Sequence, residues 1–147
     1  MENNPLIGTW RLVNWYNETK DGKRIHPLGT EAKGYISYSR EGFVFVQLIA
    51  ANRSLFALND PFGGSLKEDS SAMKSHISYA GSYECRGSNV IHRVTVSSCP
   101  NWVGTEQIRK VSLDKDRLVL SADGARFQGN VVTAHVLWDR AENALGI

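Results

Sequence analysis

The sequence is poor in cysteine, with only two thiols among its 147 residues. Cys85 and Cys99 lack the paired spacing that a CxxC-type metal site needs. If residues 81–86 and 89–98 form a hairpin, Cys85 lies near its turn and Cys99 lies beyond its open end, on the order of 30 Å away. A disulfide between them would break the hairpin, so we expect two free thiols.

The chain also lacks a secretory signal and any long hydrophobic run. Residues 1–5 have neither a basic region nor an apolar region. The longest apolar run, residues 43–51, is interrupted by Gln47 and is far too short to span a bilayer. We therefore expect a cytoplasmic protein without a membrane partner.

The chain also has no large excess of charge of one sign, because it contains 17 Lys and Arg residues and 15 Asp and Glu residues. The basic residues are scattered along the chain, which argues against a nucleic-acid partner. His26, His76 and His135 are isolated and show no metal-ligand spacing. No nucleophile elbow, P-loop or dinucleotide fingerprint is present, so we expect no metal and no cofactor.

What is present is a series of strand patterns in a chain of one-domain length. Eight segments read as strands: 6–16, 35–39, 43–49, 81–86, 89–98, 105–113, 118–122 and 131–140. Turn residues separate them, among them 40–42, 114–117 and 123–125. The pattern predicts an all-β single domain over residues 1–147, an eight-stranded antiparallel up-and-down barrel, with a sandwich as the alternative.

One long excursion, residues 52–80, breaks the strand pattern. Ser65 and Glu68 have the spacing of a helix cap, which predicts a short helix over residues 67–79. A long insertion of this kind in a compact domain is typical of a functional segment, so we expect a lid. A closed barrel has no free edge, so a homodimer would use a face or this insertion, and the sequence leaves monomer and homodimer both open.

Several motifs give the chain a family resemblance. Gly8-Thr9-Trp10 and Trp138-Asp139-Arg140, with the segments 34–38, 79–84, 90–94 and 100–109, resemble the small lipocalin-like domain proteins of bacteria and fungi. The resemblance implies an eight-stranded barrel with a central pocket, in which Trp10 plugs the closed end and Arg140 stacks on it. Because similar barrels in natural-product pathways include cofactor-free cyclases and isomerases, the resemblance also implies that such an activity is one possible function of this chain.

Pleat alternation indicates which side chains face the barrel interior. On the first strand Trp10, Leu12 and Tyr16 share one side, and Ile7, Val13 and Trp15 share the other. A two-residue turn after residue 86 or 87 places Tyr83 and Cys85 on the same side as Val90, His92, Val94 and Val96. A hairpin centred on residues 100–102 places His92 opposite Arg109 and Val94 opposite Gln107, with Gln107 and Arg109 inward.

These placements predict a polar cluster inside an aromatic barrel. In the chemical interpretation His92 transfers a proton, while Arg109 and Gln107 stabilise an enolate or a carboxylate. In the structural interpretation His92 is a hydrogen-bonded core imidazole and Arg109 lies flat at the rim. We expect the further ligand-binding residues to be Tyr35, Phe45, Tyr79, Tyr83, Asn101 and Trp102.

Two functions follow from such a pocket. The first is binding of a small, largely hydrophobic molecule that carries an acidic or carbonyl group. The alternative is a cofactor-independent isomerase or cyclase acting on a polyketide- or terpenoid-like intermediate in the same pocket. The sequence leaves open whether the protein is an enzyme, because one pocket with a few polar groups serves either role.

Overall fold

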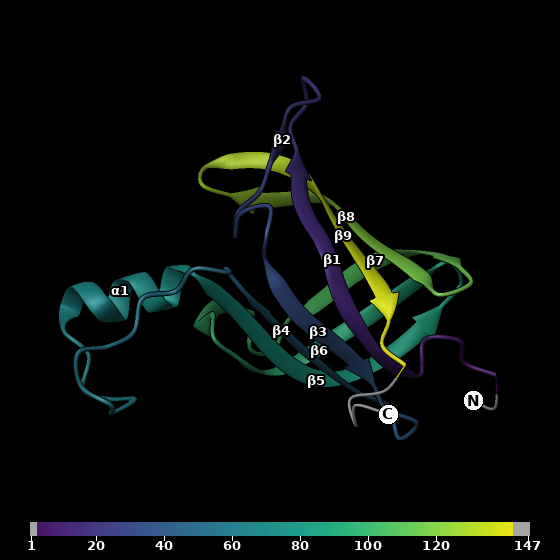
Figure 1. Cartoon of the computed structure of the whole chain (residues 1–147). Coiled ribbons are helices and arrows are strands. Elements are labelled where there is room, and N and C mark those ends of the chain that lie inside the picture. Colours follow the sequence, from purple (N-terminus) through teal and green to yellow (C-terminus); the bar gives the residue numbers. More distant parts are fainter. Residues whose placement is uncertain (1–2, 143–147) are drawn as a thin grey trace.

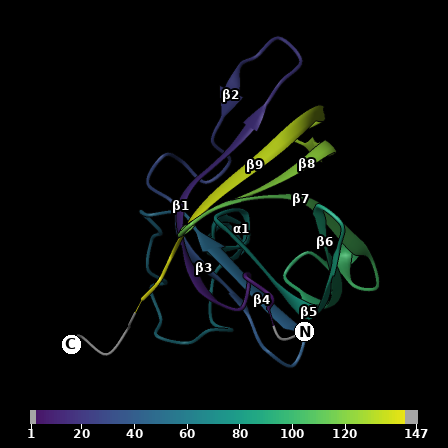
Figure 2. The same ribbon diagram turned by 90° about the vertical axis from the view of Figure 1, so that its right-hand side faces the viewer.

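The strands of the protein form one closed antiparallel sheet in a computed structural model that describes residues 3–142. The strands are β1 (Gly8–Glu18), β2 (Arg24–Ile25), β3 (Lys33–Tyr38), β4 (Phe43–Ile49), β5 (His76–Arg86), β6 (Asn89–Ser97), β7 (Glu106–Asp114), β8 (Arg117–Phe127) and β9 (Asn130–Arg140). From β3 to β9 each strand pairs with the next, and β1 pairs with both β3 and β9 (Figures 1 and 2). The predicted eight-stranded up-and-down barrel is confirmed, with the two-residue β2 added at the edge of β1.

One end of the barrel is closed by Trp10, which is fully buried. The guanidinium carbon of Arg140 lies 4.2 Å from the centre of the Trp10 ring, and two of its nitrogens donate to the carbonyls of Ile7 and Pro5. Gly8 adopts a φ of +125°, and a β-carbon there would lie 3.1 Å from the Arg140 guanidinium. The arrangement that the resemblance implied for Trp10 and Arg140 is therefore present.

A bulge in β1 decides which face its later residues use. Leu12 pairs with Trp138, but Asn14 pairs with Leu137, so Val13 is an extra residue without a partner. The alternation shifts by one there, and Trp15 and Asn17 become buried alongside Leu12. The expectation that Trp15 lies opposite Trp10 and Leu12 is wrong for this reason.

The hairpin β5–β6 confirms the predicted alternation close to its turn. Arg86 pairs with Asn89 across a Gly87-Ser88 turn, and Tyr83 pairs with the buried His92. Farther from the turn, Gly81 pairs with Val94 and Ala80 pairs with Val96, which leaves Thr95 as a bulge. Val96 consequently lies outside and is 60% exposed, so its expected place on the inner face is wrong.

The next two hairpins differ from expectation in register and in length. His92 pairs with Gln107 and Val90 pairs with Arg109, two residues away from the predicted register. The last backbone hydrogen bonds between these strands join Val94 to Thr105 and Gly104. The midpoint of the loop that holds η1 (Pro100–Trp102) therefore lies just before Pro100, earlier than predicted.

The β8–β9 turn also lies later in the chain than predicted. β8 continues through residues 123–125 as a bulge and turns only at Gln128-Gly129, where both φ values are positive. The predicted turn at residues 123–125 is therefore wrong.

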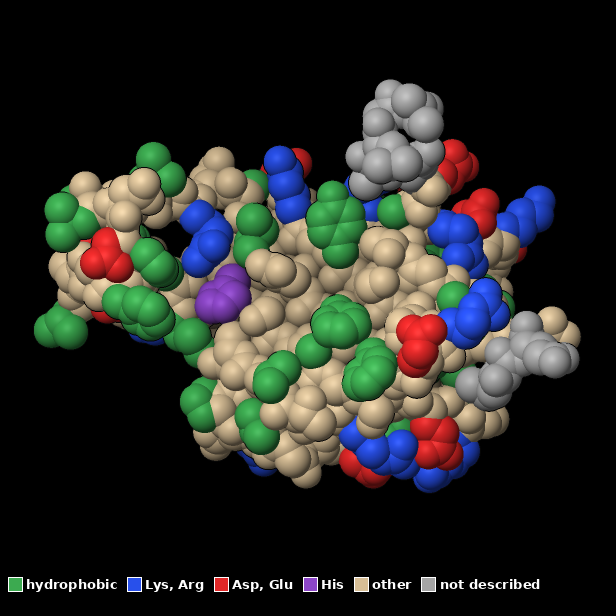
Figure 3. Space-filling model, turned by 90° about the horizontal axis from the view of Figure 1, so that it is seen from below, with side chains coloured by type: hydrophobic (Ala, Val, Ile, Leu, Met, Phe, Trp, Pro, Cys, Tyr) green, Lys and Arg blue, Asp and Glu red, His purple; other side chains and the backbone are tan. Residues whose placement is uncertain are grey.

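The insertion projects from the side of the barrel as an arm (Figures 1 and 3). Its helix α1 spans Leu66–Lys74, shorter than predicted, because from His76 onward the chain pairs with β4. The predicted Ser65 cap is present, with Ser65 and Glu68 exchanging hydrogen bonds. None of the helix residues is buried. Within residues 3–142 no helix is long and apolar enough to cross a membrane.

Candidate functional site

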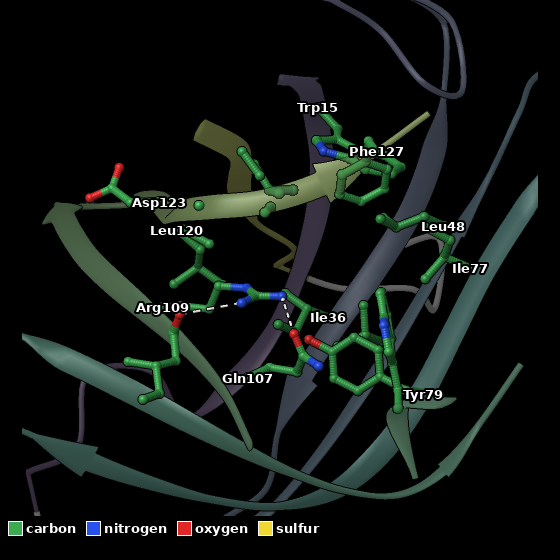
Figure 4. A pocket seen from close by; sticks show the side chains of 18 of the residues that line it. Trp15, Ile36, Leu48, Ile77, Tyr79, Gln107, Arg109, Leu120, Asp123 and Phe127 are labelled. Carbon is green, nitrogen blue, oxygen red and sulfur yellow. Dashed lines mark hydrogen bonds between the residues drawn. The ribbon is translucent and has the colours of Figure 1, made fainter. Parts of the chain in front are cut away.

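The barrel encloses a cavity of about 470 Å³ next to strands β7, β8 and β9. That volume is in the range of small-molecule sites. Figure 4 shows its side chains converging from both walls of the barrel. The lining includes Trp15, Leu48, Ile77, Tyr79, Trp102, Gln107, Arg109 and Phe127. Ile77 and Tyr79 belong to β5, and no residue of the arm that precedes β5, residues 50–75, lines the cavity. The lid role of the arm stays a prediction.

A polar side of the cavity is built on β7. Arg109 and Gln107 are both half-buried and alternate inward with exposed Glu106, Ile108 and Lys110. A guanidinium nitrogen of Arg109 donates to the side-chain oxygen of Gln107 at 3.1 Å, and the Gln107 amide donates to the Thr105 hydroxyl at 3.2 Å. This chain of bonds fixes the direction in which Arg109 extends into the cavity (Figure 4).

Arg109 has no acidic partner among the residues that the structure describes. Glu106, also at the cavity, forms its ion pair with Arg93 on the outer face. Asp123 is exposed and accepts a hydrogen bond from Thr133. Arg109 is thus free to act on an anionic or hydrogen-bond-accepting group inside the cavity.

The opposite wall is apolar and aromatic. Trp15 and Phe127 meet edge to face, with ring centres 5.5 Å apart, and Leu48 and Ile77 lie beside them (Figure 4). The ring of Trp102, from the short helix η1, packs edge to face on Tyr79 at 5.7 Å. A flat apolar body placed in the cavity would contact these rings while its polar group faces β7.

His92 lies beneath the cavity and does not line it. Its side chain is 1% exposed and sits between two phenols. The Tyr79 hydroxyl lies 2.7 Å from its Nδ1 and the Tyr38 hydroxyl lies 2.7 Å from its Nε2. Both ring nitrogens are therefore occupied, and only Tyr79 connects the imidazole to the cavity. This geometry matches the hydrogen-bonded core imidazole of the structural interpretation, and proton transfer by His92 stays a prediction.

Electrostatics keep this imidazole neutral. Burial, followed by the nearby positive charge of Arg109, lowers the pKa of His92 from 6.5 to about 3. Burial raises the pKa of Tyr79, and Arg109 opposes that rise. Burial also raises the pKa of Tyr38 well above its usual value, and the neighbouring Tyr79 adds to the rise. All three groups are consequently uncharged near neutral pH, with Arg109 the charged group beside them.

The other predicted site residues divide by position. Tyr79, Trp102, Gln107 and Arg109 line the cavity together. Tyr83 faces inward but lies toward the closed end, where its hydroxyl donates to the Ser39 carbonyl and accepts from Asn4. Asn101 is exposed on the η1 loop and does not line the cavity.

Tyr35 and Phe45 lie on the outer face of the barrel, not in the cavity. They are 52% and 55% exposed, and Tyr35 packs under the guanidinium of Arg11. The alternation of β3 and β4 places Ile36 and Val46 inward instead. Ser37 and Gln47 share the outer face with these two aromatic residues, and those polar side chains are the sequence signal that could have indicated it.

The residues of this site that the sequence analysis did not indicate include Trp15, Phe127 and Tyr38. Trp15 was missed because nothing in residues 12–14 signals the bulge. Phe127 was missed because Asp123-Gly124 imitates a turn, although Gln128-Gly129 was available as a signal. Tyr38 lies two residues beyond Ile36 on the same inward face, so correct alternation of β3 would have found it.

Comparison with known proteins gives a family match over almost the whole chain. The profile of the lipocalin-like domain matches residues 7–141. A curated relative from Aspergillus oryzae (strain ATCC 42149 / RIB 40), 4'-hydroxy-3'-methoxypropiophenone carrier protein ppsC, is 38% identical over 40% of this chain. The matched region spans 60% of the length of that relative. A solved lipoprotein, YedD from Klebsiella pneumoniae subsp. pneumoniae MGH 78578, is 10% identical with a TM-score of 0.42, over 98% of this chain and 78% of that chain.

Proposed function

The chain belongs to the lipocalin-like domain family, whose barrel suggests small-molecule binding, and we propose that it binds a small aromatic or otherwise apolar molecule bearing one carbonyl or acidic group. The observation that carries this proposal is Arg109, a guanidinium without an acidic partner in the described residues that extends into a cavity walled by Trp15 and Phe127. The ligand's acceptor oxygen lies at Arg109, and its apolar body lies against the aromatic wall.

Two features support an aryl ketone as the first ligand to test. The relative from Aspergillus oryzae is named as a carrier of 4'-hydroxy-3'-methoxypropiophenone. A molecule of that kind combines a flat ring with a carbonyl oxygen, which is the combination that the cavity's two walls accept. The proposal includes a role in secondary metabolism, and the name of this carrier relative is what supports it.

The test is a titration of the protein with this ketone, followed by tryptophan fluorescence, since Trp15 and Trp102 line the cavity. We expect saturable quenching, and a Kd that rises about 10-fold or more in Arg109→Met, because a hydrogen bond to a charged group is lost. Lys110→Met is the matched control, because Lys110 is the next residue on β7 and is exposed. Equal weakening in both variants, or no binding by the native chain, would refute the proposal.

The same site favours one alternative, a cofactor-free isomerase or cyclase. Arg109 and the Tyr79 hydroxyl are directed toward one region of the cavity (Figure 4), which is also the arrangement that stabilises an enolate oxygen. Incubation of a trace of protein with a large ketone excess, followed by mass spectrometry, separates the two roles. A carrier returns all the ketone unchanged on denaturation, whereas an isomerase converts amounts far above the protein present.

A further inference from the structure

The two phenols on either side of His92 differ in what surrounds them. The Tyr38 side chain is 1% exposed, and within residues 3–142 its hydroxyl has His92 as its sole hydrogen-bond partner. The Tyr79 hydroxyl also bonds His92, but Tyr79 lines the cavity, where its hydroxyl points toward Gln107 and Arg109 (Figure 4). Among the described residues, the Tyr38 hydroxyl therefore has only the imidazole for a hydrogen bond. The Tyr79 hydroxyl can also form a hydrogen bond with a molecule bound in the cavity.

A neutral imidazole has one N–H donor and one acceptor nitrogen, so the two phenols cannot play the same role. The pKa of His92, lowered to about 3 by burial and Arg109, ensures the neutral form at physiological pH. Either Nε2 accepts from Tyr38 and Nδ1 donates to Tyr79, or both bonds run in the opposite direction. The choice between these tautomers determines which phenol has an unused O–H.

The opposite direction leaves the Tyr38 O–H buried without an acceptor. A buried donor without a partner disfavours its arrangement by roughly 5- to 150-fold. The first direction leaves only the Tyr79 O–H unused, and that group faces a cavity where water or a ligand can accept its hydrogen bond. The first tautomer, with the proton on Nδ1, is consequently the more stable.

We propose that Tyr38 and His92 orient the Tyr79 hydroxyl so that its O–H donates into the cavity, where it and Arg109 together bind the carbonyl oxygen of the ligand. This inference rests on the proposed binding function and adds the ligand's chemical class, a molecule whose polar group accepts hydrogen bonds and donates none. Tyr79 contacts the ligand, whereas Tyr38 and His92 are positioning residues that act through it.

The tautomer is measured without any ligand, from the nitrogen chemical shifts of the His92 ring in protein labelled with nitrogen-15. We expect Nδ1 to carry the proton and Nε2 to be unprotonated at every pH from 5 to 8. In Tyr38→Phe the donor to Nε2 is removed, and we expect the proton to redistribute between the two nitrogens. A proton on Nε2 in the native chain would overturn the inference, even if the ketone binds.

The ligand contact is measured with two probes, 4'-hydroxy-3'-methoxypropiophenone and the analogue in which CH2 replaces its carbonyl. The native chain should bind the ketone more tightly than the methylene analogue. Tyr79→Phe should reduce that preference about 3- to 10-fold, because the phenol that donates to the carbonyl oxygen is lost. Tyr16→Phe, on the outer side of β1, is the matched control and should preserve the preference.

The outcomes separate the two proposals. Failure of both probes to bind the native chain refutes the proposed function, and the nitrogen shifts then still decide the direction of the Tyr79 O–H. Binding of the ketone with an unchanged preference in Tyr79→Phe supports the binding function and overturns the role of Tyr79.

Discussion

Replacement of His92 by glutamine should remove a large part of the protein's sensitivity to acid. Glutamine is neutral at every pH and offers one amide donor group and one carbonyl acceptor, so it can bond both Tyr38 and Tyr79. The native imidazole is different, because it is 1% exposed and has a pKa of about 3 in the folded protein against 6.5 in an unfolded chain. Only the native chain therefore has a histidine here that takes up a proton on unfolding.

The magnitude follows from proton linkage. The folded pKa is depressed, so the contribution of neutral His92 to stability is complete above pH 6.5 and is lost as the pH falls from 6.5 toward 3. Within that window the unfolded chain binds a proton that the folded chain does not, which costs about 1.4 kcal/mol per pH unit. Between pH 7 and pH 4.5 the native chain should lose about 2.5 kcal/mol more than the glutamine variant. That loss is a large fraction of a typical domain stability of about 5–15 kcal/mol.

The assay is urea unfolding followed by tryptophan fluorescence, at half-unit intervals from pH 7 to pH 4.5. Glu84, whose pKa is lowered by Arg93 and Arg86, and other exposed carboxylates add their own acid dependence, but they are common to both proteins and cancel in the difference. His76→Gln controls for the loss of a histidine elsewhere. Parallel curves for the native chain and His92→Gln would show that folding does not depress the pKa of His92, and would refute the reasoning.

Two further substitutions test the packing of the barrel and the stability of the arm. In Gly81→Ala the new β-carbon would lie 1.8 Å from the Arg93 carbonyl oxygen. We therefore expect the free energy of unfolding, measured in urea, to fall by about 2 kcal/mol or more. Ser82→Ala is the neighbouring control. Ser65→Ala removes the side-chain cap of α1, which should speed amide exchange over residues 66–74 about 5-fold and leave the global unfolding midpoint unchanged, because no residue of α1 is buried. A shifted midpoint would show that the arm unfolds together with the barrel.

Sequence alternation predicted correctly which side chains face inward where the strands are regular. The Gly87-Ser88 turn keeps β5 and β6 in simple register for several pairs, so the inward positions of Tyr83 and His92 followed from counting. Gln107 and Arg109 were placed inward correctly even though the register against β6 was wrong by two residues. An even shift preserves the face that each side chain uses, whereas an odd shift would have reversed it.

Bulges account for several of the errors. An extra residue at Val13 or Thr95 reverses the face of everything beyond it, and neither position carries a glycine or another local signal. Tyr35 and Phe45 were misplaced for a different reason, because β4 is apolar on both faces around Phe45 and Val46. The His92 bonds to Tyr38 and Tyr79 depend on three strands meeting in space, which no local pattern encodes.

The pairing of β1 with β9 means that the barrel cannot close until the end of the domain has been synthesised. While residues 130–140 are still inside the ribosome, β1 and β8 each present a row of unpaired backbone groups to other chains. Contacts between such distant parts of a chain form slowly. The hazard of aggregation is therefore greatest during translation, and it ends when Arg140, the last residue of β9, reaches Trp10, near the start of β1.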